Sequence, residues 1–243
     1  MTGGGTTEGT LLGGAIRYRQ FAEGYRTGLE PVLLAAFVPA APGARVVEAG
    51  CGAGAGLLCL AHRVRLGEGV GVERDPALAA LANANFKENG FGQLGAEAAA
   101  IETWQPATRF DHALANPPWH DPAGTPSPLS GRRDAKEGGA ETVALWARQL
   151  SAALTAGGTL SMVLPSALLG AALSAFAAAE LGRLTVFPLW PGRGRPARLL
   201  LVRGVKAQRG PDQLLAGLVL HRAEGELSDE AERVLRGGEA IGA

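Results

Sequence analysis

An asparagine, two prolines and a tryptophan follow an apolar, strand-like run near the middle of the chain. The run covers residues 110–115, and Asn116, Pro117, Pro118 and Trp119 come directly after it. An amino nitrogen conjugated to a ring becomes a better nucleophile when acceptors hold its hydrogens and draw its lone pair out of the ring plane. The Asn116 Oδ1 atom and the Pro117 carbonyl can be those acceptors, because each proline fixes its own φ near −65° and stiffens the loop. Trp119 offers a flat face for a base, worth about 1–3 kcal/mol of stacking. The motif indicates chemistry on a planar amino group, with a plain turn after a strand as the alternative.

A glycine-rich turn lies upstream of this motif. Residues 46–49 form an apolar, strand-like run, and residues 57–61 are typical of a helix that begins directly after the turn. Glycine allows a positive φ and a close approach of the backbone to a ligand, and the amino end of the helix points at that ligand. The turn residues that we expect to contact it are Gly50, Cys51, Gly52, Gly54 and Gly56. Nicotinamide, flavin and S-adenosylmethionine (SAM) proteins share such a turn.

Two acidic residues narrow the choice of ligand. Glu73 directly follows a second strand-like run, residues 69–72, and its carboxylate is placed there to accept both hydroxyls of a ribose. The next residue, Arg74, is also predicted to contact the cofactor. That carboxylate serves NAD equally well. Glu48 precedes the glycines, and its carboxylate favours the positive charge of a sulfonium, with a helix-capping acid as the alternative. Because hydride transfer needs neither Glu48 nor the Asn116 motif, SAM is the favoured cofactor.

Taken together, these motifs resemble those of the class I SAM-dependent methyltransferases that methylate amino groups. Residues 48–56, Glu73 and residues 116–119 correspond to motifs I, II and IV of that family. Residues 24–35 are similar to the N-terminal segment of bacterial valine-tRNA adenine-37 N6-methyltransferases, and Gly28 is counted there among the cofactor contacts. The resemblance implies an α/β, Rossmann-like fold with a seven-stranded, mostly parallel sheet whose last strand is antiparallel. It also implies SAM as the cofactor, which Glu48 helps to orient.

Two positions depart from the family pattern. The third strand of the family usually ends in an Asp that binds the adenine amino group of SAM, but residues 97–102 contain no Asp. Backbone groups near Ala100 and Ile101, or the side chain of Glu102, can take over that contact. Trp119 stands where tyrosine or phenylalanine is commoner, and any of the three can stack on a base.

The remaining segments alternate between strand-like and helix-like patterns, which is typical of a parallel, doubly wound sheet. Strands are expected at 159–164, 184–187, 199–202 and 217–221, and helices at 76–89, 141–154, 167–179 and from 228 onward. Residues 121–139 are expected to form a long polar loop. Residues 1–11 are expected to be a disordered tail, and residues 12–243 a single methyltransferase domain.

Composition excludes several classes of protein. The 243 residues include 23 basic and 23 acidic ones, so the chain as a whole is no nonspecific polyanion binder. The two cysteines, Cys51 and Cys59, fit no metal motif and predict a reduced, cytoplasmic protein. The N-terminus does not read as a signal peptide, and the apolar run at 167–179 is shorter than the roughly 20 residues that span a bilayer.

Basic residues gather in three places that are candidate RNA contacts, with a solvated surface as the alternative. These are Arg193, Arg195, Arg198, Arg203, Lys206 and Arg209 beside Trp190; Arg132, Arg133 and Lys136; and Arg17, Arg19 and Arg26.

The sequence therefore predicts a SAM-dependent enzyme that methylates the exocyclic N6 amine of an adenine in tRNA. By resemblance, the base is adenine 37 of a valine tRNA, and bases of an anticodon loop are already partly unstacked. The alternatives are guanine N2 of ribosomal RNA, glutamine N5 of a protein, or a weakly catalytic RNA-binding module with the same fold. A nicotinamide oxidoreductase is a more distant alternative.

Overall fold

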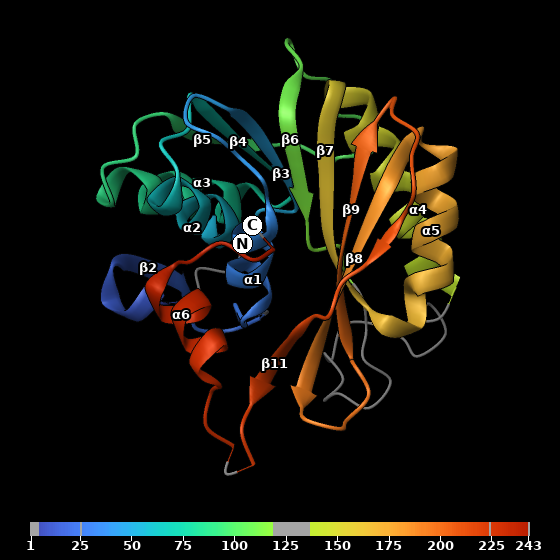
Figure 1. The fold of residues 1–243 in the computed structure, drawn as a ribbon. Helices are drawn as coiled ribbons and strands as arrows, with labels where there is room; N and C mark the ends of the chain where they lie inside the picture. The colour runs from blue at the N-terminus through green and yellow to red at the C-terminus, as the bar shows by residue number, and fades with distance from the viewer. Residues whose placement is uncertain (1–4, 25, 119–136, 224, 243) are drawn as a thin grey trace.

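A large, mostly parallel sheet with helices on both faces forms the body of the protein (Figure 1). The computed structural model describes residues 5–24, 26–118, 137–223 and 225–242. In this part of the chain the sheet has nine strands, in the order β10-β8-β9-β7-β6-β3-β4-β5, and β11 pairs with β8. The strands are β3 (Arg45–Ala49), β4 (Glu68–Glu73), β5 (Leu94–Ala98), β6 (Phe110–Ala115), β7 (Leu154–Pro165), β8 (Leu181–Gly192), β9 (Leu199–Lys206), β10 (Gln213–Leu214) and β11 (Leu218–His221).

The seven strands from β3 to β9 confirm the expected core of the sheet. β9 is the last of these in the chain and pairs antiparallel with both β7 and β8. β10 and β11 then add to β8 in parallel, so the full sheet has nine strands where seven were expected. A two-residue strand such as β10 has no periodicity by which the sequence could reveal it.

Alternating residues of the strands build two apolar layers. Val46 and Leu114 face the layer of α1 (Glu30–Phe37), α2 (Ala55–Arg63) and α3 (Pro76–Glu88). Val47, Ala113 and Ala115 face the layer of α4 (Glu137–Ala153) and α5 (Leu169–Ala178). Because both faces of the central strands are covered, these strands read as continuous apolar runs.

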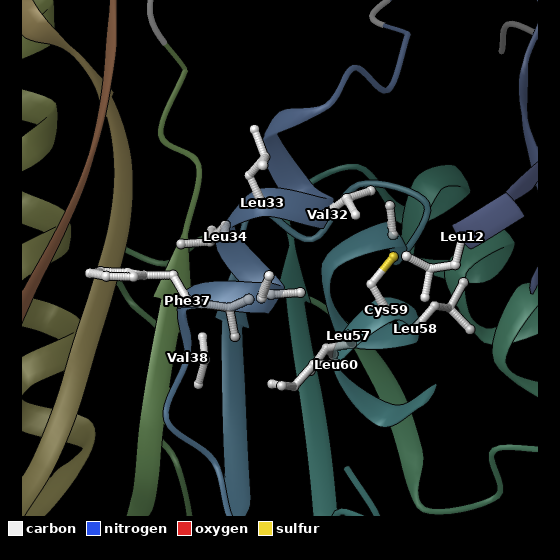
Figure 2. Packing of buried hydrophobic residues seen from close by; sticks show 14 of the residues in the cluster. Leu12, Val32, Leu33, Leu34, Phe37, Val38, Leu57, Leu58, Cys59 and Leu60 are labelled. Carbon is white, nitrogen blue, oxygen red and sulfur yellow. The ribbon is translucent and has the colours of Figure 1, made fainter. Parts of the chain in front are cut away.

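Helix α1 is buried on all sides, between the sheet and α2. Figure 2 shows Leu34 and Phe37 directed toward the strands, and the Phe37 ring lies 6.0 Å from the Phe187 ring of β8. Residues 31–37 are all buried, so the last carbonyls of the helix cannot reach water. Arg63 donates to the carbonyls of Ala35 and Val38, and Arg203 donates to the Phe37 carbonyl at 3.0 Å. Two cations therefore satisfy the negative end of the helix dipole.

An N-terminal hairpin replaces most of the expected disordered tail. β1 (Thr6–Leu11) pairs antiparallel with β2 (Ile16–Phe21) from Thr6↔Phe21 to Leu11↔Ile16, with a short 3-10 turn at Leu12–Gly14 between them. The expectation of disorder is therefore wrong for residues 6–11. Glu8 and Gly9 lower the apparent strand propensity of this segment, but pairing with β2 supplies its backbone hydrogen bonds.

Asn85 of α3 and Asn89, which directly follows that helix, fasten this hairpin to the body of the protein. Asn89 accepts a hydrogen bond from the Arg17 N–H and donates to the Arg17 carbonyl. One turn earlier, Asn85 makes the same pair of bonds with Arg19. Two amides four residues apart on a helix thus imitate a neighbouring strand, because β2 presents backbone groups of one edge at alternate residues.

The expected helices and the C-terminal elements are confirmed, with shifted ends. Asp75 Oδ1 accepts from the Ala77 N–H at 2.8 Å and starts α3. Helix α6 (Asp229–Gly237) follows β11 and starts at Ser228, whose side chain accepts from the Ala231 N–H. Among the described residues, no helix combines the length and apolar character needed to cross a membrane.

Candidate functional site

Three of the predicted site residues meet at one edge of the sheet, where β3, β4 and β6 end. Ala49 pairs with Val72 of β4 and with Ala115 of β6. The next residue along each strand is therefore Gly50, Glu73 or Asn116. The crossover from β3 through α2 and the one from β6 through α4 leave this point in opposite directions, over opposite faces. Such a switch point is where open α/β sheets bind ligands.

The glycines of the turn fall into two kinds. Gly50, Gly52 and Gly54 all have positive φ, at 63°, 54° and 88°. A Cβ on Gly50 would lie 2.7 Å from the Trp146 ring of α4, and one on Gly54 would lie 2.5 Å from the Phe86 ring of α3. Packing against these rings requires glycine at both positions. A Cβ on Gly52 would meet nothing within 4 Å, so the turn is open there.

The last glycine of the turn makes room for Glu48. A Cβ on Gly56 would lie 2.2 Å from Glu48 Oε1, and Glu48 Oε2 accepts a hydrogen bond from the Leu57 N–H at 2.9 Å. Glu48 thus caps the first turn of α2 from β3, which confirms the helix-capping contact that was the alternative for this residue. Burial raises the pKa of Glu48 to about 8, although the Leu57 N–H lowers it. A nearby cation would favour the charged form of this carboxyl group.

Glu73 is held in a fixed orientation by the backbone. Its Oε2 atom accepts from the Gly52 N–H and its Oε1 atom from the Asp75 N–H, both at 3.0 Å. A carboxylate has about four acceptor positions, so each oxygen retains one for a ligand hydroxyl. The Arg74 side chain beside it is exposed.

The segment that follows β5 replaces the Asp with which the third strand of the family usually ends. The Ala100 carbonyl accepts from the N–H groups of Thr103 and Trp104, and the Ile101 side chain is buried in the core. Glu97 accepts from Trp104 Nε1 at 2.7 Å. Of the groups proposed to replace the Asp, the exposed Glu102 side chain is therefore the most accessible.

The three described residues of the Asn-Pro-Pro-Trp motif follow β6 directly. Asn116 is half-buried, Pro117 buried and Pro118 exposed. Trp119 and the basic residues Arg132, Arg133 and Lys136 lie outside the described residues.

Two polar residues that lie beside predicted cofactor contacts or the glycine turn were not predicted from the sequence. Glu30, at the start of α1, has a buried Oε2 atom without a hydrogen-bond partner among the described residues. A Cβ on Gly28 would lie 2.2 Å from this oxygen, so Gly28 leaves room for the carboxylate. Asn85 is fully buried and donates to the Ala53 carbonyl inside the turn, at 2.9 Å. Glu30 could have been predicted from the sequence, because an acidic residue at the start of an apolar helix is conspicuous. The contacts of Asn85 could not, because they depend on the tertiary fold.

The basic residues that are close in the sequence separate in space. Arg193, Arg195 and Arg198 lie on the hairpin between β8 and β9, at the carboxyl edge. Arg203 donates to the Phe37 carbonyl, with its guanidinium 4.7 Å from the centre of the Phe37 ring. Lys206 pairs with Glu180 at the opposite edge. The first of the three basic groups therefore does not form one surface, because the eight residues of β9 span about 27 Å.

The N-terminal arginines are also partly engaged. Arg17 and Arg19 both form ion pairs with Glu88, and Arg26 donates to the Thr7 hydroxyl. They hold the hairpin in place, so a role in RNA contact is not needed to explain them.

The strand order, the reversed β9 and the glycine turn at the switch point define the fold of the class I methyltransferases. Known proteins agree with this assignment. Residues 30–132 match the family model "Methyltransferase small domain". A tRNA1(Val) (adenine(37)-N6)-methyltransferase of a Flavobacteriaceae bacterium is 30% identical over 104 residues, which are 42% of this chain and 45% of the relative. The chain thus matches slightly less than half the length of this curated relative.

Solved structures confirm the fold. A protein of Agrobacterium tumefaciens described as a predicted O-methyltransferase aligns with a TM-score of 0.71 at 21% identity, over 87% of this chain and 97% of the other. The 16S rRNA N2 G1207 methyltransferase of T. thermophilus, solved with AdoMet and guanosine, aligns with a TM-score of 0.57 at 19% identity, over 83% of this chain and 50% of the other. The resemblance to class I methyltransferases found in the sequence motifs is confirmed.

Proposed function

We propose that this protein is a SAM-dependent N-methyltransferase that methylates the N6 amine of an adenine in tRNA, adenine 37 of a valine tRNA being the favoured target. The observation that carries the proposal is the position of Asn116 and Pro117 beside the glycine turn, at the shared carboxyl edge of β3 and β6. The matched relative, named for methylation of adenine 37 in this tRNA, supports the choice of base. Buried, unpaired cysteines fit the cytoplasm, where tRNA is modified.

The residues at the switch point fit SAM. Glu73 retains acceptor positions for the ribose hydroxyls, and Gly52 leaves the turn open. The unpaired Oε2 atom of Glu30, at the start of α1, is a further acceptor that we propose for the ammonium group of SAM. Glu48 supplies a buried carboxyl group whose charged form a sulfonium would stabilise. When bound, SAM supplies an electrophilic methyl group. Arg74 is a further candidate contact because it follows Glu73.

Asn116 and the Pro117 carbonyl would hold the two hydrogens of the acceptor amine. Both acceptors belong to a stiff segment at the end of a buried strand, so little order has to be gained when the base is bound. The nitrogen lone pair is then directed out of the ring plane, and Trp119 would stack on the base. Transfer would be a direct displacement: the nitrogen would form a bond to the methyl carbon as the bond between that carbon and the sulfonium sulfur breaks, with S-adenosylhomocysteine as the leaving group. The nitrogen would then release a proton to water.

A second acceptor is guanine N2 in ribosomal RNA, because the T. thermophilus enzyme with that printed activity shares the fold. Glutamine N5 of a protein is a further alternative, and a weakly catalytic RNA-binding module is the most distant one. The missing Asp after β5 is the argument for the module.

Labelled SAM incubated with unmodified total RNA, and separately with protein, tests the proposal. N6-methyladenosine confined to tRNA, identified by mass, is the expected product. Asn116→Ala should abolish transfer while SAM binding stays nearly intact, since its contacts are to the acceptor amine. N2-methylguanosine or labelled protein would move the function to the alternatives, and SAM binding without any product would favour the module.

A further inference from the structure

The β8–β9 hairpin extends past the edge of the sheet that carries the candidate site. Pro165 at the end of β7 pairs with Leu199, and Leu189 of β8 also pairs with Leu199. Residues 190–198 therefore project beyond the carboxyl edge. The edge strand β11 braces this projection, because Val219 pairs with Trp190 and His221 with Gly192. The hairpin is thus a supported structure that points in the same direction as Asn116.

The turn of this hairpin displays three arginines. Arg195 N–H donates to the Gly192 carbonyl at 3.1 Å, and Gly194 takes the positive φ of 75° that the turn requires. The side chains of Arg193, Arg195 and Arg198 are exposed. In the described part of the chain, none of the three has an ion-pair or hydrogen-bond partner for its guanidinium group.

Several other basic side chains are neutralised by a neighbour. Arg17, Arg45 and Lys206 pair with glutamates, and Arg222, which follows β11, pairs with Asp229 of α6. Residues 190–198 themselves contain no acidic residue. Three unpaired arginines on a nine-residue projection leave a local excess of positive charge.

The distance from the hairpin to the site suits an RNA. Arg198 opposes Ser166, whose N–H donates to the Arg198 carbonyl at 2.8 Å, and Ala115 opposes Met162 on the same strand β7. The backbones of Arg198 and Asn116 are therefore two strands apart across the sheet and about three residues apart along the strand direction. These two offsets correspond to a distance of about 14 Å between the backbones. When the target base of an RNA stem–loop lies at Asn116, the phosphates a few nucleotides from that base can reach this hairpin.

We propose that Arg193, Arg195 and Arg198 on the β8–β9 hairpin form the phosphate-binding surface that holds the RNA substrate over the carboxyl edge. This inference rests on the proposed function and adds to it the part of the protein that grips the RNA backbone. Arginine suits this contact because its planar fork matches a phosphate. Contacts to phosphates do not distinguish one base from another. The three arginines would therefore increase the affinity for RNA and position it, but would not select its sequence.

A charge-matched pair of variants tests this surface. The hairpin variant carries Arg193→Gln, Arg195→Gln and Arg198→Gln. The control carries Arg65→Gln and Arg209→Gln together with Arg183→Gln, which removes the same charge at the amino edge. The affinity of each protein for an unmodified valine-tRNA transcript is measured from 50 to 300 mM NaCl, and its SAM affinity and melting temperature are measured in parallel.

The hairpin variant should bind the transcript at least about tenfold more weakly near 0.1 M salt, and its plot of log K against log salt should be shallower by about 2 to 3. SAM affinity and melting temperature should match the unsubstituted protein, and the control should bind RNA nearly as well as that protein. Equal losses in the two variants, or an unchanged hairpin variant, would overturn the surface while leaving RNA methylation standing. A chain that binds no RNA before any substitution would overturn the proposed function, and the surface with it.

Discussion

Replacement of Asn85 by alanine should weaken both the fold and the binding of SAM, whereas replacement of Asn89 should affect neither strongly. Asn85 is fully buried and makes three hydrogen bonds, two with the Arg19 backbone and one to the Ala53 carbonyl in the glycine turn. Asn89 makes the equivalent bonds with Arg17 but lies where water can replace them. The two asparagines are therefore a matched pair that differs mainly in contact with the turn.

The size of the effect follows from the bonds lost. Three hydrogen bonds at about 1 kcal/mol each, one of them buried and two partly buried, plus the cost of leaving the Ala53 carbonyl unpaired, give about 3–5 kcal/mol for Asn85→Ala. Asn89→Ala should cost about 1 kcal/mol, because solvent takes over the freed groups. Without the Asn85 bond the turn loses one fixed point, so the SAM dissociation constant should rise about tenfold, equivalent to 1.4 kcal/mol.

Urea unfolding gives the first quantity and calorimetric titration with SAM the second. Asn85→Asp is a useful third variant, because it keeps the acceptor for the Arg19 N–H and loses both donors. A folded Asn85→Ala protein that binds SAM as tightly as the unsubstituted one would contradict this prediction, and so would an Asn89→Ala protein whose SAM binding is weakened to the same extent.

The remaining predictions concern Glu48, its glycine neighbour and the end of α1. Gly56→Ala should lower the free energy of unfolding by about 1–3 kcal/mol because its Cβ would collide with Glu48, whereas Gly92→Ala, with nothing within 4 Å, should be near neutral; equal urea midpoints would contradict this. The pKa of Glu48 is raised from an ordinary value of 4.5 to about 8, so its contribution to stability is complete below pH 4.5 and is lost as the pH rises toward 8. Glu48→Gln should therefore flatten the decline in unfolding free energy between pH 5 and 8, and parallel profiles for the two proteins would count against a protonated Glu48. Arg203→Met should cost about 2 kcal/mol by leaving a buried carbonyl of α1 unpaired, while Arg209→Met at an exposed position should change the melting temperature little.

Much of the fold was predictable because local pattern and tertiary structure agree in the central strands. The short runs before Gly50 and after Arg109 are each bounded by turn residues, which is typical of buried strands, and the glycine turn marks the connection from the first run to a helix. The extra strand β10 and the N-terminal hairpin were not predictable in this way. β10 depends on pairing with β8, and the hairpin is fastened to the body of the protein by Asn85 and Asn89, which are distant in the sequence from both of its strands.

The site shows the same division. Glu48, Glu73 and Asn116 could be found because each lies at or directly after the end of a strand that the sequence predicts. The basic cluster was misjudged because β9 carries its members from one edge of the sheet to the other. Trp146 and Phe86 are also distant in the sequence from the glycine turn. The sequence therefore did not show that their rings leave no room for a side chain at Gly50 and Gly54.

Methyl transfer to a single base tests the central claim most directly. Two unmodified valine-tRNA transcripts that differ only in adenine or guanine at position 37 are incubated with labelled SAM, and the product nucleosides are identified by mass. The proposed function predicts about one methyl group per molecule, as N6-methyladenosine, in the adenine transcript and none in the guanine transcript. Equal labelling of both transcripts, or a product other than N6-methyladenosine, would contradict it.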